Sequence, residues 1–201
     1  MKLYYSPGAC SQAVHIVLRE LGLPFEAVAV DLATKRSAAG EDLYQINPKG
    51  RVPALVLDDG TVLTECTAVL QYLAQRNSPP RLAPAPGTIA HYRLLEWLSF
   101  LGSEVHQNFL PLFAPAEAAV NQEAARNAIV RRFDYLDREL TGRHYLLGDA
   151  FTVADAYLYV LVGWARYVGL DLARWPALTA THARIGARPA VEAAERAEHG
   201  A

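Results

Sequence analysis

Strand-forming patterns are confined to the first third of this 201-residue chain, and this asymmetry limits the folds that it can adopt. The predicted strands are residues 2–5, 25–31, 54–58 and 61–64. Apolar residues at helical spacing predict helices over residues 11–22 and 67–76. Asp59-Gly60 is a strong hairpin signal, so the last two strands are expected to be antiparallel. The opening unit is therefore predicted to run β-α-β and then β-β-α.

The remainder of the chain is predicted to be helical. Four prolines between Asn77 and Thr88 prevent a helix or a central strand from running through that segment, which we interpret as a domain linker. The helices expected beyond it are residues 89–113, 122–140, 153–168, 175–187 and 189–199. Thr152 and Asp155 fit a capping box, and the helix that they begin is apolar nearly all round and so central. The expected domains are residues 1–77, the linker 78–88 and an all-helical domain 89–201.

Composition excludes several classes of partner. The net charge is −2, and no block of basic residues suggests binding to nucleic acid or to an anionic membrane. The chain shows no signal-peptide pattern and no run of eighteen apolar residues, so we expect a soluble, cytoplasmic protein. The two cysteines are too few for a disulfide framework and fit a reducing compartment.

Cys10 is a candidate reactive thiol. It follows a strand that breaks at Pro7-Gly8, and a helix is predicted to begin directly after it. The N–H groups and positive end of a helix favour a thiolate, so we expect the pKa of this thiol to be lowered. The residue three positions on is Ala13, which excludes a Cys-x-x-Cys redox pair.

Two further segments of the first unit can bind a ligand. Pro53 precedes a predicted strand, and a cis Val52–Pro53 bond would turn the Val52 backbone outward to pair with a peptide; the alternative is a trans proline at an edge strand. Glu65 and the backbone N–H of Cys66 at a helix start could hold an amine and a carboxylate, although Glu65 could simply cap the helix. Lys35 could face a carboxylate or be solvated.

Polar residues also gather on the long helix predicted from residue 89. Ser99, Ser103 and His106 share one face of a regular α-helix, while Glu104 points about a quarter-turn away. A single helical histidine is more often structural than functional. The six histidines have no metal-ligand spacing, and we expect no metal site.

Together these segments resemble the glutathione S-transferases, and specifically the bacterial beta class. The matching motifs are YYSPGACS at 4–11, NPKGRVPAL at 47–55, LTE at 63–65, EWLSFL at 96–101, SEVH at 103–106 and FTVADAY at 151–157. The resemblance spans nearly the whole chain. It implies a thioredoxin-like N-terminal domain, an all-helical C-terminal domain, a homodimer, and glutathione as co-substrate without a metal.

The resemblance also implies roles for single residues. Val52 would pair with the cysteinyl part of glutathione, Glu65 and the Cys66 backbone would hold its γ-glutamyl end, and Lys35 would face its glycine carboxylate. Cys10 and His106 would lie nearest the sulfur as the catalytic pair. The remaining contacts to glutathione would come from Ser99, and from Ser103 and Glu104 partly across the dimer. Ser99, Gln107 and Cys66 depart from the Asn, Lys and small residue often found at these positions.

The implied activity is attack of the glutathione thiolate on a hydrophobic electrophile, a detoxification reaction. Two alternatives remain open at this point: glutathione-dependent thiol-disulfide exchange through Cys10, and non-enzymatic binding of hydrophobic ligands.

Overall fold

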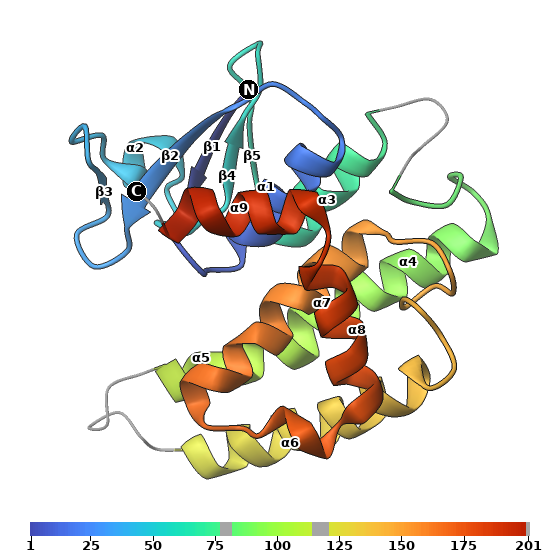
Figure 1. Cartoon of the computed structure of the whole chain (residues 1–201). Coiled ribbons are helices and arrows are strands. Elements are labelled where there is room, and N and C mark those ends of the chain that lie inside the picture. The colour runs from blue at the N-terminus through green and yellow to red at the C-terminus, as the bar shows by residue number, and fades with distance from the viewer. Residues whose placement is uncertain (77–81, 114–120, 200–201) are drawn as a thin grey trace. The chain divides into compact units, whose positions relative to one another are not determined.

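The computed structural model describes residues 1–76, 82–113 and 121–199 of the chain (Figure 1). The chain divides into two units, of which one combines Met1–Arg81 with Ala187–Ala201 and the other is Leu82–Gly186.

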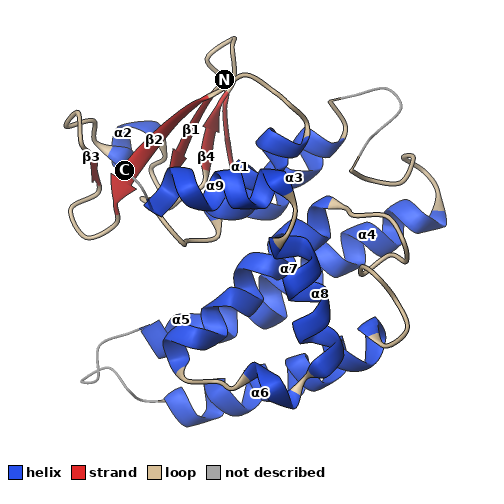
Figure 2. Cartoon of the chain, viewed as in Figure 1, coloured by secondary structure: helices blue, strands red, loops and turns tan. Residues whose placement is uncertain are grey.

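The first unit is built on a five-stranded mixed sheet with strand order β3-β2-β1-β4-β5 (Figure 2). Its strands are β1 Lys2–Tyr5, β2 Glu26–Asp31, β3 Arg36–Ser37, β4 Ala54–Val56 and β5 Val62–Thr64. β1 and β2 are parallel, and the other pairs are antiparallel. Its helices are α1 Ser11–Glu20, α2 Leu43–Ile46, α3 Cys66–Ala74 and α9 Pro189–His199. The expected β-α-β and β-β-α order is present.

Both faces of this sheet are covered. Successive side chains of a strand point to opposite faces, so Leu3 and Tyr4 of β1 contribute to different layers of the core. Tyr4 and its cross-strand partner Ala54 pack in one cluster with Val52 and with Leu43 of α2. β3 and α2 were not expected from the sequence, and α2 supplies the apolar cover for this cluster.

The second unit contains helices and no β-strand among its described residues. Its elements are α4 Ile89–Phe100, a π-helix Leu101–His106, α5 Gln107–Phe113, α6 Gln122–Leu140, α7 Val153–Gly163, 3₁₀ turns at Trp164–Val168 and Leu172–Arg174, and α8 Pro176–Gly186. Every residue of α7 from Val153 to Val162 is buried, which confirms that this helix is central. The capping box at its start is also confirmed, because Asp155 accepts from the backbone N–H of Thr152 at 2.8 Å.

A π-helix interrupts the helix that the sequence predicted over residues 89–113. Hydrogen bonds in a π-helix join residues five apart, so it turns more slowly than an α-helix. Ser103, Glu104 and His106 all lie within this segment. The α-helical spacing used to assign these residues to faces therefore does not apply to them.

The C-terminal helix differs from its expected place in a helical domain 89–201. α9 packs against α1, and so residues from Ala187 onward group with the sheet-containing unit. Arg188, just before α9, pairs with Glu20 at the end of α1, with Nε and Oε1 2.6 Å apart. The predicted linker 78–88 falls partly on residues 77–81, which lie outside the described residues. At its described end, Leu82 is buried and its carbonyl accepts from the Val153 N–H at 3.0 Å.

Candidate functional site

Cys10 lies at the N-cap of α1, directly after the turn that follows β1, as the sequence predicted. The residue is 9% exposed, and its Sγ donates to the backbone carbonyl of Val52 at 3.4 Å. The Val52–Pro53 bond is cis, which confirms the expected conformation of this loop. The thiol at the start of α1 and the loop before β4 are therefore in direct contact.

Cys66 brings a third segment to the same place. It is the first residue of α3, and its Sγ donates to the backbone carbonyl of Cys10 at 3.4 Å. Burial raises the pKa of the Cys66 thiol well above its ordinary value, and the neighbouring Cys10 side chain raises it further. Three of the expected site residues, Cys10, Val52 and Cys66, thus meet at one end of the sheet.

The two charged candidate residues of this unit, Glu65 and Lys35, each have a partner within the protein. Glu65, the N-cap of α3, has a φ of 66°, and its exposed carboxylate forms an ion pair with Lys49. The Lys49 ammonium also donates to Thr64 Oγ1 at 2.7 Å. Lys35 donates from Nζ to the carbonyl of Gly50 at 3.0 Å. The loop 49–52 therefore contacts Glu65, Lys35 and Cys10.

The expected site residues of the helical unit point toward different neighbours. Ser103 Oγ donates to the carbonyl of Ser99 at 2.9 Å. Glu104 forms an ion pair with Arg132 of α6 at 2.5 Å. Ser99 and Ser103 therefore lie together where α4 meets the π-helix, and Glu104 links the π-helix to α6.

His106 turns toward the interior of the same unit. Its Nδ1 lies 2.6 Å from the hydroxyl of Tyr157 on the central helix α7. Its ring packs edge-on against Trp164, with centroids 4.9 Å apart. The structure thus fixes the orientation of this imidazole through two residues that lie more than fifty positions later in the chain.

Three partners of the expected site residues were missed from the sequence. Lys49 and Tyr157 stand inside the motifs quoted above, at 47–55 and 151–157, but no role was assigned to them. Arg132 belongs to a helix with many charged residues, so nothing in the local sequence marks it as the partner of Glu104. The pairs of these residues form only in the folded chain.

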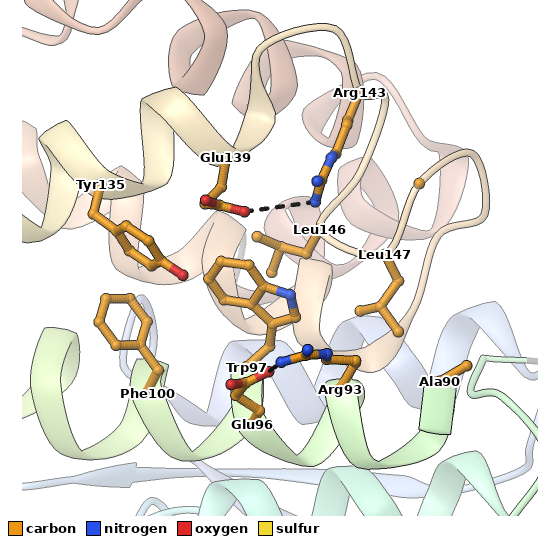
Figure 3. A pocket seen from close by; sticks show the side chains of 11 residues that line it. Ala90, Arg93, Glu96, Trp97, Phe100, Tyr135, Glu139, Arg143, Leu146 and Leu147 are labelled. Atoms are coloured by element: carbon orange, nitrogen blue, oxygen red, sulfur yellow. Dashed lines mark hydrogen bonds and ion pairs between the residues drawn. The ribbon is translucent and has the colours of Figure 1, made fainter. Parts of the chain in front are cut away.

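The helical unit also holds a cavity of about 860 Å³, shown in Figure 3. The rings of Trp97, Phe100 and Tyr135 line it, with centroids 5.4, 5.8 and 6.0 Å apart. Two ion pairs, Arg93–Glu96 and Arg143–Glu139, complete much of its wall. None of the four expected site residues of this unit is among the described residues that line it, so the cavity is a separate feature.

Neither a metal-binding cluster nor a membrane-spanning helix occurs in the described part of the chain. No three His, Cys, Asp or Glu side chains in the described ranges gather closely enough to hold a metal ion. Among the helices of residues 1–76, 82–113 and 121–199, none combines the length and apolar character needed to cross a bilayer.

Comparison with known proteins identifies the family. The family models for the glutathione S-transferase N-terminal and C-terminal domains match residues 7–76 and 117–184. Glutathione S-transferase GstA of Escherichia coli O157:H7 is 42% identical over 98% of both chains.

Two solved structures extend the match to the fold. A sphingomonad glutathione S-transferase complexed with glutathione is 54% identical, covers 100% of both chains and has a TM-score of 0.94. A bacterial beta class glutathione S-transferase from Sphingomonas chungbukensis is 49% identical over 98% of both chains, with a TM-score of 0.93. The fold class and the enzyme class expected from the sequence are confirmed, and the chain belongs to the glutathione S-transferase family.

Proposed function

We propose that this enzyme binds glutathione in its thioredoxin-like unit and transfers the glutathione thiolate to hydrophobic electrophiles. The observation that carries the proposal is the meeting of Cys10, Val52 and Cys66, which joins a helix start, a loop with a cis proline and a second helix start. The two helix starts direct backbone N–H groups and positive partial charge at an anionic ligand. Neither alternative activity gains support over conjugation from the relatives.

Each end of glutathione has a proposed partner in this unit. The backbone of Val52 pairs with the cysteinyl residue, and the Cys66 N–H receives the γ-glutamyl carboxylate. The Glu65 carboxylate binds the γ-glutamyl amine. This amine then shares the Glu65 carboxylate with Lys49 or displaces Lys49 from it. Lys35, now bonded to the Gly50 carbonyl, turns to the glycine carboxylate. The exchange at Glu65 costs little, because an exposed ion pair contributes only about 0–1 kcal/mol.

Residues of the helical unit complete the proposed site. His106 lies nearest the glutathione sulfur with Cys10, and its contact with Tyr157 holds the imidazole in place. Ser99, Ser103 and Glu104 approach the glutamyl end, the last two in part from the partner subunit of a homodimer. Ser99 is short and Gln107 is uncharged, so the proposal gives the catalytic roles to His106 and Cys10.

The chemistry requires only a modest lowering of the glutathione pKa. Bringing a thiol pKa from about 9 to about 7 requires roughly 2 to 3 kcal/mol, which a helix end and one or two hydrogen bonds can supply. The thiolate then forms a bond to an electrophilic carbon, and the leaving group departs with the bonding electron pair. The proposed setting is detoxification in the cytoplasm, which fits two cysteines without a disulfide.

Steady-state conjugation of glutathione to a chlorinated nitrobenzene tests the proposal with Glu65→Gln. Losing a charge-assisted hydrogen bond costs about 1.5 to 3 kcal/mol, so the KM for glutathione should rise roughly 10- to 150-fold while kcat changes little. Glu123→Gln, at an exposed position of α6, is the matched control and should leave both constants unchanged. An unchanged KM in Glu65→Gln would remove this residue from the site, and absence of conjugation in the unmodified enzyme would refute the function.

A further inference from the structure

The side chain of Cys66 has no part in the proposed conjugation, which uses only its backbone. Its sulfur nevertheless lies against the other cysteine of the chain, with Cys66 Sγ 3.4 Å from the Cys10 carbonyl oxygen. The Cys10 side chain also contributes to the raised pKa of the Cys66 thiol, as expected of two neighbouring thiols. The chain contains two cysteines, and this contact between a thiol and a backbone carbonyl brings both of them together. The pairing joins residues 56 positions apart, so it depends on the fold.

The two thiols have different environments. Cys10 is the N-cap of α1 and its thiol contacts the Val52 carbonyl, whereas Cys66 is the first residue of α3 and its thiol contacts the Cys10 carbonyl. Burial raises the pKa of the Cys66 thiol, so this sulfur stays protonated and does not compete as the first nucleophile. It can still attack a neighbouring sulfur within the same molecule, because proximity replaces a bimolecular encounter.

We propose that Cys66 is a resolving thiol, which closes a disulfide with Cys10 after Cys10 has reacted with a small-molecule disulfide. Closing the disulfide requires a rotation of the Cys10 side chain. Cys10 Sγ leaves the Val52 carbonyl, a weak S–H···O contact at 3.4 Å, and rotates toward Cys66. This proposed reaction differs from conjugation, because it reduces a disulfide. The first step of the reaction needs no glutathione.

The reaction balances in three steps. The Cys10 thiolate attacks a disulfide R–S–S–R, a protein–S–S–R bond forms, and one R–S⁻ leaves and takes a proton from water. Cys66 then loses its proton to solvent or to the departing thiolate and attacks the Cys10 sulfur; the Cys10–Cys66 bond forms and the second R–S⁻ leaves. Two glutathione thiols finally reduce the protein disulfide and become glutathione disulfide. Two electrons thus pass from the protein to R–S–S–R and are restored by glutathione.

Intact-mass spectrometry of the whole enzyme tests the proposal with hydroxyethyl disulfide as the probe. The reduced enzyme is mixed with the probe, quenched with acid at intervals, and weighed. The unmodified protein should lose two hydrogens and both free thiols without lasting gain of a hydroxyethylthio group. In Cys66→Ser the adduct on Cys10 should instead accumulate, and in Cys10→Ser little adduct should form.

The controls distinguish a disulfide within one chain from a disulfide between two chains and from a folding defect. A bond between two chains would double the mass and depend on protein concentration, whereas the proposed bond would do neither. Circular dichroism establishes that each variant is folded, and peptide mapping of the unmodified protein identifies a Cys10–Cys66 crosslink without relying on any variant. A lasting adduct on Cys10 in the unmodified protein, equal to that in Cys66→Ser, would overturn the proposal. Conjugation kinetics do not enter this readout, so the proposal can fail while the proposed function stands.

Discussion

Cys10 and Cys66 are almost equally shielded, with 9% and 8% of their surface exposed, so access alone does not decide which thiol reacts first. The thiolate is the reactive form, and burial raises the pKa of Cys66 well above its ordinary value. We therefore predict that iodoacetamide modifies Cys10 first as pH is raised from neutral. Peptide mass spectrometry after timed labelling measures both rates in one sample. Equal rates, or faster labelling of Cys66, would contradict the prediction.

For single residues, the sequence predicts only those features that depend on neighbouring positions in the chain. The place of Cys10 follows from adjacent residues, a strand that breaks at Pro7-Gly8 and a helix that begins directly after. The ion pairs could not be predicted in this way. Lys49 reaches Glu65 sixteen positions later, and Glu104 reaches Arg132 twenty-eight positions later. Such pairs depend on how separate elements pack, and local periodicity carries no information about that.

The start of α7 depends on a buried carboxylate. Asp155 accepts from the N–H of Leu146 and from the N–H and hydroxyl of Thr152, at 2.7–2.8 Å. Burial raises the pKa of Asp155 to about 6, and these hydrogen bonds oppose the rise. The folded state therefore holds this proton more tightly than the unfolded chain, in which an aspartate titrates near pH 4.

The stability that protonated Asp155 contributes should therefore be present below about pH 4 and lost as pH rises to about 6. A shift of this size corresponds to roughly 2–3 kcal/mol. In urea unfolding, the free-energy difference between the unmodified protein and Asp155→Asn should thus be larger at pH 4 than at pH 7. Glu123→Gln serves as the exposed control. A difference that is constant, or that grows with pH, would contradict the assignment.

Long helices could be predicted from the sequence, whereas the shortest α-helix and strand could not. Helices such as α1 and α6 repeat their apolar spacing over several turns, which makes the period readable. β3 has two residues and α2 has four, too few to show any period. The π-helix at Leu101–His106 is hidden for another reason, since its residues suit an ordinary helix and only packing reveals the wider turn.

The first unit is built from both ends of the chain. The sequence predicts α9 as the last of several consecutive helices. Its order along the chain therefore suggests that it belongs to the helical domain. Its assignment depends instead on buried polar contacts with α1, which no helical pattern can reveal. A domain built from two separate segments of the chain is therefore the part of this architecture that is hardest to predict from the sequence.

Glu198 on α9 is the centre of those contacts, and its loss should weaken the unit that holds Cys10. Its buried carboxylate accepts from the N–H of Gly8 at 3.0 Å and from Gln12 Nε2 at 3.2 Å, and it lies 2.9 Å from His15 Nδ1. Glu198→Ala leaves these groups without this acceptor, at a cost of about 3 kcal/mol, or roughly 6–12 °C in Tm. Thermal unfolding should record that drop, and amide exchange should quicken around Gly8. Glu192→Ala, on the exposed face of the same helix, should change the Tm by less than about 2 °C. Equal shifts in the two variants would show that Glu198 does not anchor α9 to the Cys10 segment.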